Sequence, residues 1–261
     1  MTKTNFKTAY TLSAMIAILA VVASTGGLFL ENLYRDVSFF KLAFQGNDVV
    51  TLFVAVPILV AAMILAKRGS ERGQLVWAAM LGYMLYNYAF YLFGANFNWF
   101  FQIYVALFAL SIYALIYVLS GLDTEGMSRK FSEQTPVRWI SGYMIFIAGF
   151  LGIFEFTKSL SLILRSEVPK DPVLVFALDL SLIVPAMAVG AIWLWRRRPW
   201  GYVLAAMMTL KGATYGLALL AMAAFVARAG EWDSLTPFYG FVAAGGIVTS
   251  WLLLRNFDKN R

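Results

Sequence analysis

Eight stretches of predominantly apolar residues follow one another along the chain. Each is long enough to cross a membrane as an α-helix, because the hydrocarbon core is about 30 Å thick and a helix rises about 1.5 Å per residue. None shows the period-2 alternation of a barrel strand. The predicted spans are Ala9–Leu30, Val49–Ala66, Leu75–Phe93, Phe97–Leu119, Trp139–Phe156, Val173–Trp195, Trp200–Val226 and Phe238–Leu254. The sequence therefore predicts an all-α, polytopic membrane bundle of eight transmembrane helices.

The composition excludes whole classes of protein. Hydrophobic residues make up 61% of the chain and charged residues 13%, against about 45–50% and 25% in ordinary soluble domains. A soluble enzyme of this size could not bury so much apolar surface. The chain has 0 cysteines and 0 histidines, which excludes disulfides, thiolate nucleophiles, His-ligated haem, Cys/His zinc sites and Ser-His-Asp triads. No cofactor is expected.

The positive charges predict an orientation in the membrane. Most Lys and Arg residues lie in loops on the same side as the N-terminus, including Lys67–Arg68, Arg129–Lys130 and Arg196–Arg198. Because cytoplasmic loops carry the excess of Lys and Arg, we expect a protein of the inner (cell) membrane with both termini in the cytoplasm. The net charge of +7 is mostly this topological signal. The expected partner is therefore the lipid bilayer and not a nucleic acid.

An internal repeat is indicated by a shift of the sequence by 128 residues. The shift superposes the helix-breaking and turn residues Pro57 on Pro185, Arg68 on Arg196 and Gly73 on Gly201. We therefore predict a tandem 4+4 pseudo-repeat, with halves at residues 1–120 and 138–261 and a polar cytoplasmic linker at 121–137. Two short apolar segments, Ser38–Phe44 and Ser159–Leu164, are expected to lie in the membrane interface or to fold back over the bundle.

Three ionisable residues fall inside the predicted spans, namely Glu155, Asp179 and Lys211. A charge at the bilayer centre costs about 2.5–3.5 kcal/mol on insertion scales, so each needs a partner or water. Their depths allow Asp179 and Lys211 to meet as an ion pair. Such a pair would either fix the register of two helices or line a polar cavity. Glu155 is expected to form a salt bridge with Lys158 one turn later, at the rim of the bundle.

Tyrosine and asparagine side chains gather in the outer half of the third predicted span. One interpretation is an aromatic belt at the membrane interface, which accounts for Tyr88, Tyr91 and Trp99. Asp48 is expected to cap the N-terminus of the second span at the same level. The other interpretation is an outward-facing polar pocket. Its candidate ligand-binding residues are Asp48, Tyr83, Asn87, Asp179, Lys211 and Tyr215.

Two segments carry a resemblance to other proteins. Gly46–Leu52, and Leu81–Phe90 followed by Phe97 and Asn98, resemble a widespread set of uncharacterised prokaryotic multi-pass membrane proteins. The resemblance implies a membrane-embedded helical fold. It carries no assigned activity, so it adds no site residue.

Three functional hypotheses follow from these features. The first is a protein that binds, and moves, a small or amphiphilic solute in the polar pocket. The second is a non-catalytic membrane subunit that assembles with or regulates a partner protein, or forms a homo-oligomer, through lipid-facing stripes of small residues. The third is a lipid-modifying enzyme whose acid and base come from Asp48, Glu155 and Asp179. Because no catalytic motif is present, we do not expect an enzyme.

Overall fold

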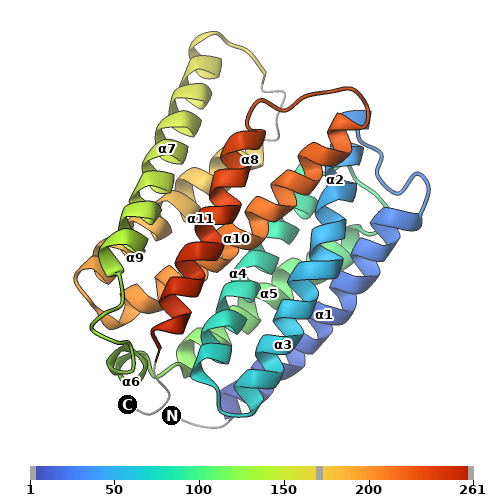
Figure 1. Cartoon of the computed structure of the whole chain (residues 1–261). Coiled ribbons are helices and arrows are strands. Elements are labelled where there is room, and N and C mark those ends of the chain that lie inside the picture. The colour runs from blue at the N-terminus through green and yellow to red at the C-terminus, as the bar shows by residue number, and fades with distance from the viewer. Residues whose placement is uncertain (1–3, 169–172, 258–261) are drawn as a thin grey trace. The chain divides into compact units, whose positions relative to one another are not determined.

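The computed structural model describes residues 4–168 and 173–257, which form helices joined by short loops and turns (Figure 1). Helices account for 83% of the structure, and the described residues form no strand. This confirms the all-α prediction. Seven helical segments within the described residues are long and apolar enough to cross a membrane. They are Phe6–Phe29, Ser38–Lys67, Phe101–Gly121, Val137–Leu164, Val173–Trp195, Pro199–Ala227 and Thr236–Arg255.

The apolar faces of these seven helices point mostly outwards. Between 28% and 44% of the residues in the most apolar window of each helix are buried within the protein. Large side chains such as Phe53, Ile153 and Ile163 stay about 70% exposed. A monomeric soluble protein rarely exposes such extended apolar surface. These helices therefore identify a membrane protein.

The chain divides into two compact units. The first consists of residues 1–122 and 210–247, and the second of residues 123–209 and 248–261. The first unit contains α1 (Thr4–Phe29), α2 (Ser38–Val50), η1 (Thr51–Ala55), α3 (Val56–Lys67), α4 (Glu71–Gly94) and α5 (Phe101–Gly121). The second contains α6 (Thr124–Arg129), α7 (Val137–Leu164), α8 (Val173–Leu178), η2 (Asp179–Ile183) and α9 (Val184–Trp195). Helices α10 (Pro199–Ala227) and α11 (Thr236–Arg255) contribute residues to both.

Helix α4 is the most enclosed element of the first unit. It packs against α3 and α5, while α5 also packs against α1. Its buried residues extend over all faces, from Leu75 to Tyr91. Trp77 stacks on Tyr10 of α1 with ring centroids 4.4 Å apart and donates its indole N–H to Ser13 at 2.9 Å. A helix enclosed by other helices can carry polar side chains, because it offers no face to lipid.

The second spanning segment is one continuous helix with a widened turn. Helix α2 passes through η1, a π-helix in which the Val56 N–H donates to the carbonyl of Thr51, five residues earlier. Pro57 follows at once and has no N–H to donate, and its ring would collide with the carbonyl four residues earlier. A widened turn relieves that collision. The same arrangement occurs at η2, where the Val184 N–H donates to the carbonyl of Asp179 ahead of Pro185.

Two sequence-based expectations about helix ends are wrong. Ser38–Phe44 is the first part of α2, and Ser159–Leu164 is the last part of α7, so neither is a separate interfacial segment. Asp48 consequently lies well inside α2 and does not cap it. The sequence pattern could not reveal that α2 begins at Ser38. A turn with several polar residues in the middle of a long helix has the same pattern as the start of a new helix.

Candidate functional site

A carboxylate buried in the first unit forms the centre of the candidate site. Asp48 is 2% exposed. The hydroxyl of Tyr34, on the loop between α1 and α2, donates to its Oδ2 at 2.5 Å. The hydroxyl of Tyr91, on α4, lies 3.0 Å from its Oδ1 and 3.2 Å from the carbonyl of Phe44. In the part of the chain that the structure describes, all the hydrogen-bonding partners of this carboxyl group are neutral.

Asn47, next to Asp48 on α2, extends the site into a hydrogen-bonded network. Its amide donates to Oδ1 of Asn87 at 2.7 Å and to the Tyr91 hydroxyl at 3.1 Å. Its own Oδ1 accepts from the hydroxyl of Tyr83 at 3.5 Å. The Tyr83 hydroxyl is also 3.0 Å from that of Thr51, the first residue of the widened turn. The network therefore joins α2, η1 and α4 by polar contacts inside an apolar bundle.

Helix α1 also borders the site, in addition to α2 and α4. Gly27 lies so close to Asp48 that a Cβ atom there would overlap both the carboxylate and the Tyr34 hydroxyl. Ser24, three residues earlier on α1, is buried beside Asp48. The glycine thus leaves the space that the carboxyl group and the tyrosine occupy.

Three buried hydroxyl groups around Asp48 have no hydrogen-bond partner among the described residues: those of Ser24, Tyr88 and Tyr104. Each of the three residues is 1% exposed. Tyr88 and Tyr104 are close enough to interact with the charge of Asp48. Buried polar groups without partners are rare in proteins, since each costs about 1–3 kcal/mol.

Lys211, on the part of α10 that belongs to the first unit, lies in an aromatic environment. It is 6% exposed, and its Nζ is 3.6 Å from the ring centroid of Tyr86 and 4.8 Å from that of Tyr215. Ammonium groups are attracted to aromatic faces at these distances, and more strongly where water is excluded. The Tyr215 ring also meets that of Tyr83 at 6.4 Å. An aromatic chain thus connects Lys211 with the Asp48 network.

The structure brings together five of the six residues predicted to bind a ligand. Asp48, Tyr83 and Asn87 are linked through Asn47, and Lys211 and Tyr215 adjoin them. Asp179 and Glu155 are buried in the second unit. The pair between Asp179 and Lys211 therefore stays a prediction, as does the salt bridge of Glu155 with Lys158.

The aromatic-belt interpretation is wrong for two of its three residues. Tyr88 and Tyr91 are 1% and 2% exposed, whereas Trp99 is 81% exposed as a belt residue should be. Tyr34, Asn47 and Thr51 are members of the network that were not predicted. The available signal for Asn47 and Thr51 was their position in the Gly46–Leu52 segment, which carries three polar residues between apolar runs. Tyr34, in a loop 14 positions before Asp48, has no such signal.

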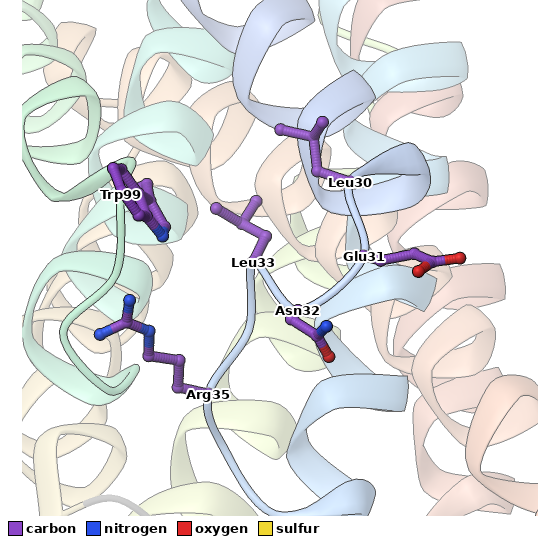
Figure 2. Close-up of a pocket in the computed structure, with 6 residues that line it drawn as sticks. All are labelled: Leu30, Glu31, Asn32, Leu33, Arg35 and Trp99. Carbon is purple, nitrogen blue, oxygen red and sulfur yellow. The ribbon is translucent and has the colours of Figure 1, made fainter.

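A surface cavity lies next to this network. It has a volume of about 400 Å³ and is shown in Figure 2. Leu33 and Arg35, the neighbours of Tyr34 in the chain, both line it, and Trp99 stands on its other side. The side chain of Tyr34 instead is buried and reaches Asp48. One short stretch of loop therefore lies between the cavity and the carboxyl group.

No family model, curated protein or solved structure matches the chain. Within the described residues, no group of three or more Asp, Glu, Cys or His side chains is placed to hold a metal ion. The class that fold and site define is a helical membrane protein with an enclosed polar network beside a widened helix turn.

Proposed function

We propose that this protein spans the inner membrane eight times, with both termini in the cytoplasm. The eighth span is α4, whose 24 residues extend about 36 Å at 1.5 Å per residue and so exceed the hydrocarbon thickness of about 30 Å. Its tyrosines and Asn87 lower its mean hydropathy, but they are buried against other helices. An even number of spans also agrees with the clusters of Lys and Arg, which then all face the cytoplasm.

The 4+4 repeat is part of the same proposal. The boundaries of η1 and α3 recur in η2 and α9 with an offset of 128 residues, and α4 and α10 begin at the same offset. The shared widened turn before a Val-Pro pair supports the repeat more strongly than sequence identity, because such turns are rare. On this offset, Asp179 and Lys211 correspond to Thr51 and Tyr83, whose hydroxyl groups are 3.0 Å apart.

The function that the site supports best is the binding and transport of a small or amphiphilic solute. The observation that carries this proposal is the position of a wholly buried polar network directly before a widened helix turn, whose first residue, Thr51, is a member of the network. Irregular backbone at membrane depth is tolerated where it is enclosed by protein or lines a cavity, and it is a recurrent feature of transporter binding sites. Asn47, Asn87 and the Tyr83 hydroxyl would supply hydrogen bonds to the solute, and the tyrosine rings apolar contact.

Thermal unfolding of the purified protein in lipid nanodiscs tests this proposal. A panel of small polar, cationic and amphiphilic solutes is added to wild type, Tyr83→Phe and the control Tyr113→Phe, which changes a tyrosine that is 59% exposed. A solute at 100 times its Kd should stabilise the folded state by about 2.7 kcal/mol. We expect the stabilisation to fall in Tyr83→Phe and to persist in the control. No response to any solute, or an unchanged response in Tyr83→Phe, would contradict the proposal.

A further inference from the structure

The hydroxyl group of Tyr91 has more acceptors than it has hydrogens. It accepts from the Asn47 amide at 3.1 Å and lies 3.2 Å from the Phe44 carbonyl and 3.0 Å from Oδ1 of Asp48. A phenol has one hydrogen to donate. The carbonyl can only accept, so if it takes the hydrogen of Tyr91, the contact with Asp48 needs a hydrogen from the carboxyl group itself. One proton on Oδ1 of Asp48 then satisfies every member of this set.

The surroundings of Asp48 favour the neutral form as well. Its titratable neighbours are the phenols of Tyr34 on the loop, of Tyr83, Tyr88 and Tyr91 on α4, and of Tyr104 on α5. The α1 face contributes Ser24 and Gly27, which do not titrate. No charged side chain of the described residues forms a hydrogen bond or ion pair with the carboxyl group, and isolated buried charges are costly.

We propose that Asp48 is a proton-binding site, protonated on Oδ1 in this closed arrangement and able to exchange that proton with the outer surface past Tyr34. The proposal deepens the proposed function by naming the proton as the ion that acts at the same site. A larger cation does not fit between the carboxylate and its partners, because the oxygen atoms of Tyr34 and Tyr91 lie 2.5 Å and 3.0 Å from it.

The deprotonated form also has donors at hand. The hydroxyls of Tyr34 and Tyr91 lie 2.5 Å and 3.0 Å from the two carboxyl oxygens, so Tyr34 keeps donating to Oδ2 and the Tyr91 hydrogen can turn from the Phe44 carbonyl to Oδ1 once the proton has left. Hydrogen bonds to a charged acceptor contribute about 1.5–3 kcal/mol each. Both protonation states can therefore be satisfied, which distinguishes an exchanging group from an acid that is permanently neutral.

The route of exchange follows from the loop. Leu33 and Arg35 line the surface cavity of about 400 Å³ (Figure 2). Tyr34, between them in the chain, donates its hydroxyl hydrogen to Oδ2 of Asp48. A small displacement of this loop would connect the carboxyl group with the cavity. Tyr34 is thus a positioning residue that both fixes the carboxyl group and separates it from the surface.

Infrared spectroscopy of the protein in nanodiscs tests the proposal. An ordinary aspartate is ionised at neutral pH, so a carboxylic acid C=O band at neutral pH that disappears in Asp48→Asn identifies the proton on Asp48. We expect this band, and we expect it to shift after transfer to D₂O. The control Glu125→Gln replaces an exposed carboxylate of α6 and should leave the band unchanged.

A second variant provides an independent test in case Asp48→Asn does not fold. Tyr34→Phe keeps the carboxyl group but removes the hydrogen bond to Oδ2, so the band should move to higher frequency. The proposal is overturned by the absence of an acid band at neutral pH, by a band that does not shift in D₂O within a day, or by carboxylate bands that respond to Na⁺. If the protein shows the acid band but binds no solute, the proposed function is contradicted and the proton-binding site is supported.

Discussion

Tyr34 and Asp48 are joined by a hydrogen bond of 2.5 Å that ties the α1–α2 loop to the interior of the bundle. Both residues are buried, at 4% and 2% exposure. The bond links a loop residue to a helix residue 14 positions later. It helps to position the carboxyl group, which the Tyr91 hydroxyl joins to the amide of Asn47 and so to the rest of the polar network.

Tyr34→Phe should therefore lower the free energy of unfolding by about 1–3 kcal/mol, because a buried acceptor loses its donor. Thermal unfolding in detergent measures the effect. Tyr113→Phe, at an exposed position, serves as the matched control and should unfold like wild type. Equal melting temperatures for all three proteins would show that the bond contributes nothing to the folded state.

Gly27→Ala should destabilise the protein by about 1–3 kcal/mol, because the added methyl group would overlap the Asp48 carboxylate and the Tyr34 hydroxyl. Gly149→Ala on α7 is the control, since a Cβ atom there meets nothing within 4 Å. In that helix the alanine should be neutral or stabilising by up to about 1 kcal/mol. If Gly27→Ala unfolds like Gly149→Ala, the close approach of α1 to the carboxyl group is wrong.

The predicted ion pair of Asp179 and Lys211 calls for a double-mutant cycle. Asp179→Asn and Lys211→Met should each lower the melting temperature, because each leaves one buried charge without its partner, and the double variant should recover part of the loss. Losses that simply add would show that the two side chains do not interact. Single variants that melt like wild type would instead show that both groups are hydrated.

The number of spans can be tested by labelling, and the absence of cysteine from the chain gives a clean background. Arg68→Cys lies on the exposed turn between α3 and α4, and Phe97→Cys on the exposed loop after α4. If α4 crosses the membrane, an impermeant thiol reagent added outside intact cells should label Phe97→Cys and spare Arg68→Cys until the cells are lysed. Labelling of both positions from the same side would exclude α4 as a span.

The loop itself should respond to pH through Asp36. Burial raises the pKa of its carboxyl group, while the hydrogen bond that it accepts from the Asn96 N–H at 3.0 Å opposes the shift. Because the folded state holds the proton more tightly, this contribution to stability is complete below the ordinary pKa and is lost as the pH rises through the raised pKa. The melting temperature of wild type should thus fall across that range relative to Asp36→Asn. Parallel pH profiles would contradict this.

Local sequence patterns predicted where the long apolar helices lie, but not all of their ends. The apolar runs of the sequence predicted the seven helical segments that are long and apolar enough to cross a membrane. In hydrocarbon the backbone of such a run must form its hydrogen bonds internally, which a helix achieves. The positions of Pro57 and Pro185 marked the two widened turns, although nothing in their neighbours indicated a π-helix. The ends of α2 and α7 were missed, since half-polar turns do not stop a helix that is packed on its neighbours.

The sequence by itself determined the class of protein and the polar residues that would need a partner or water in a membrane, because charges and unpaired backbone groups are costly in hydrocarbon whatever the arrangement of the helices. Tertiary structure alone decided the partners of Asp48. The Tyr34 hydroxyl arrives from a loop, the Tyr91 hydroxyl from α4, and the space for both from a glycine on α1. Hydrogen bonds act over about 3 Å, so only the packing of these segments could show which polar groups meet.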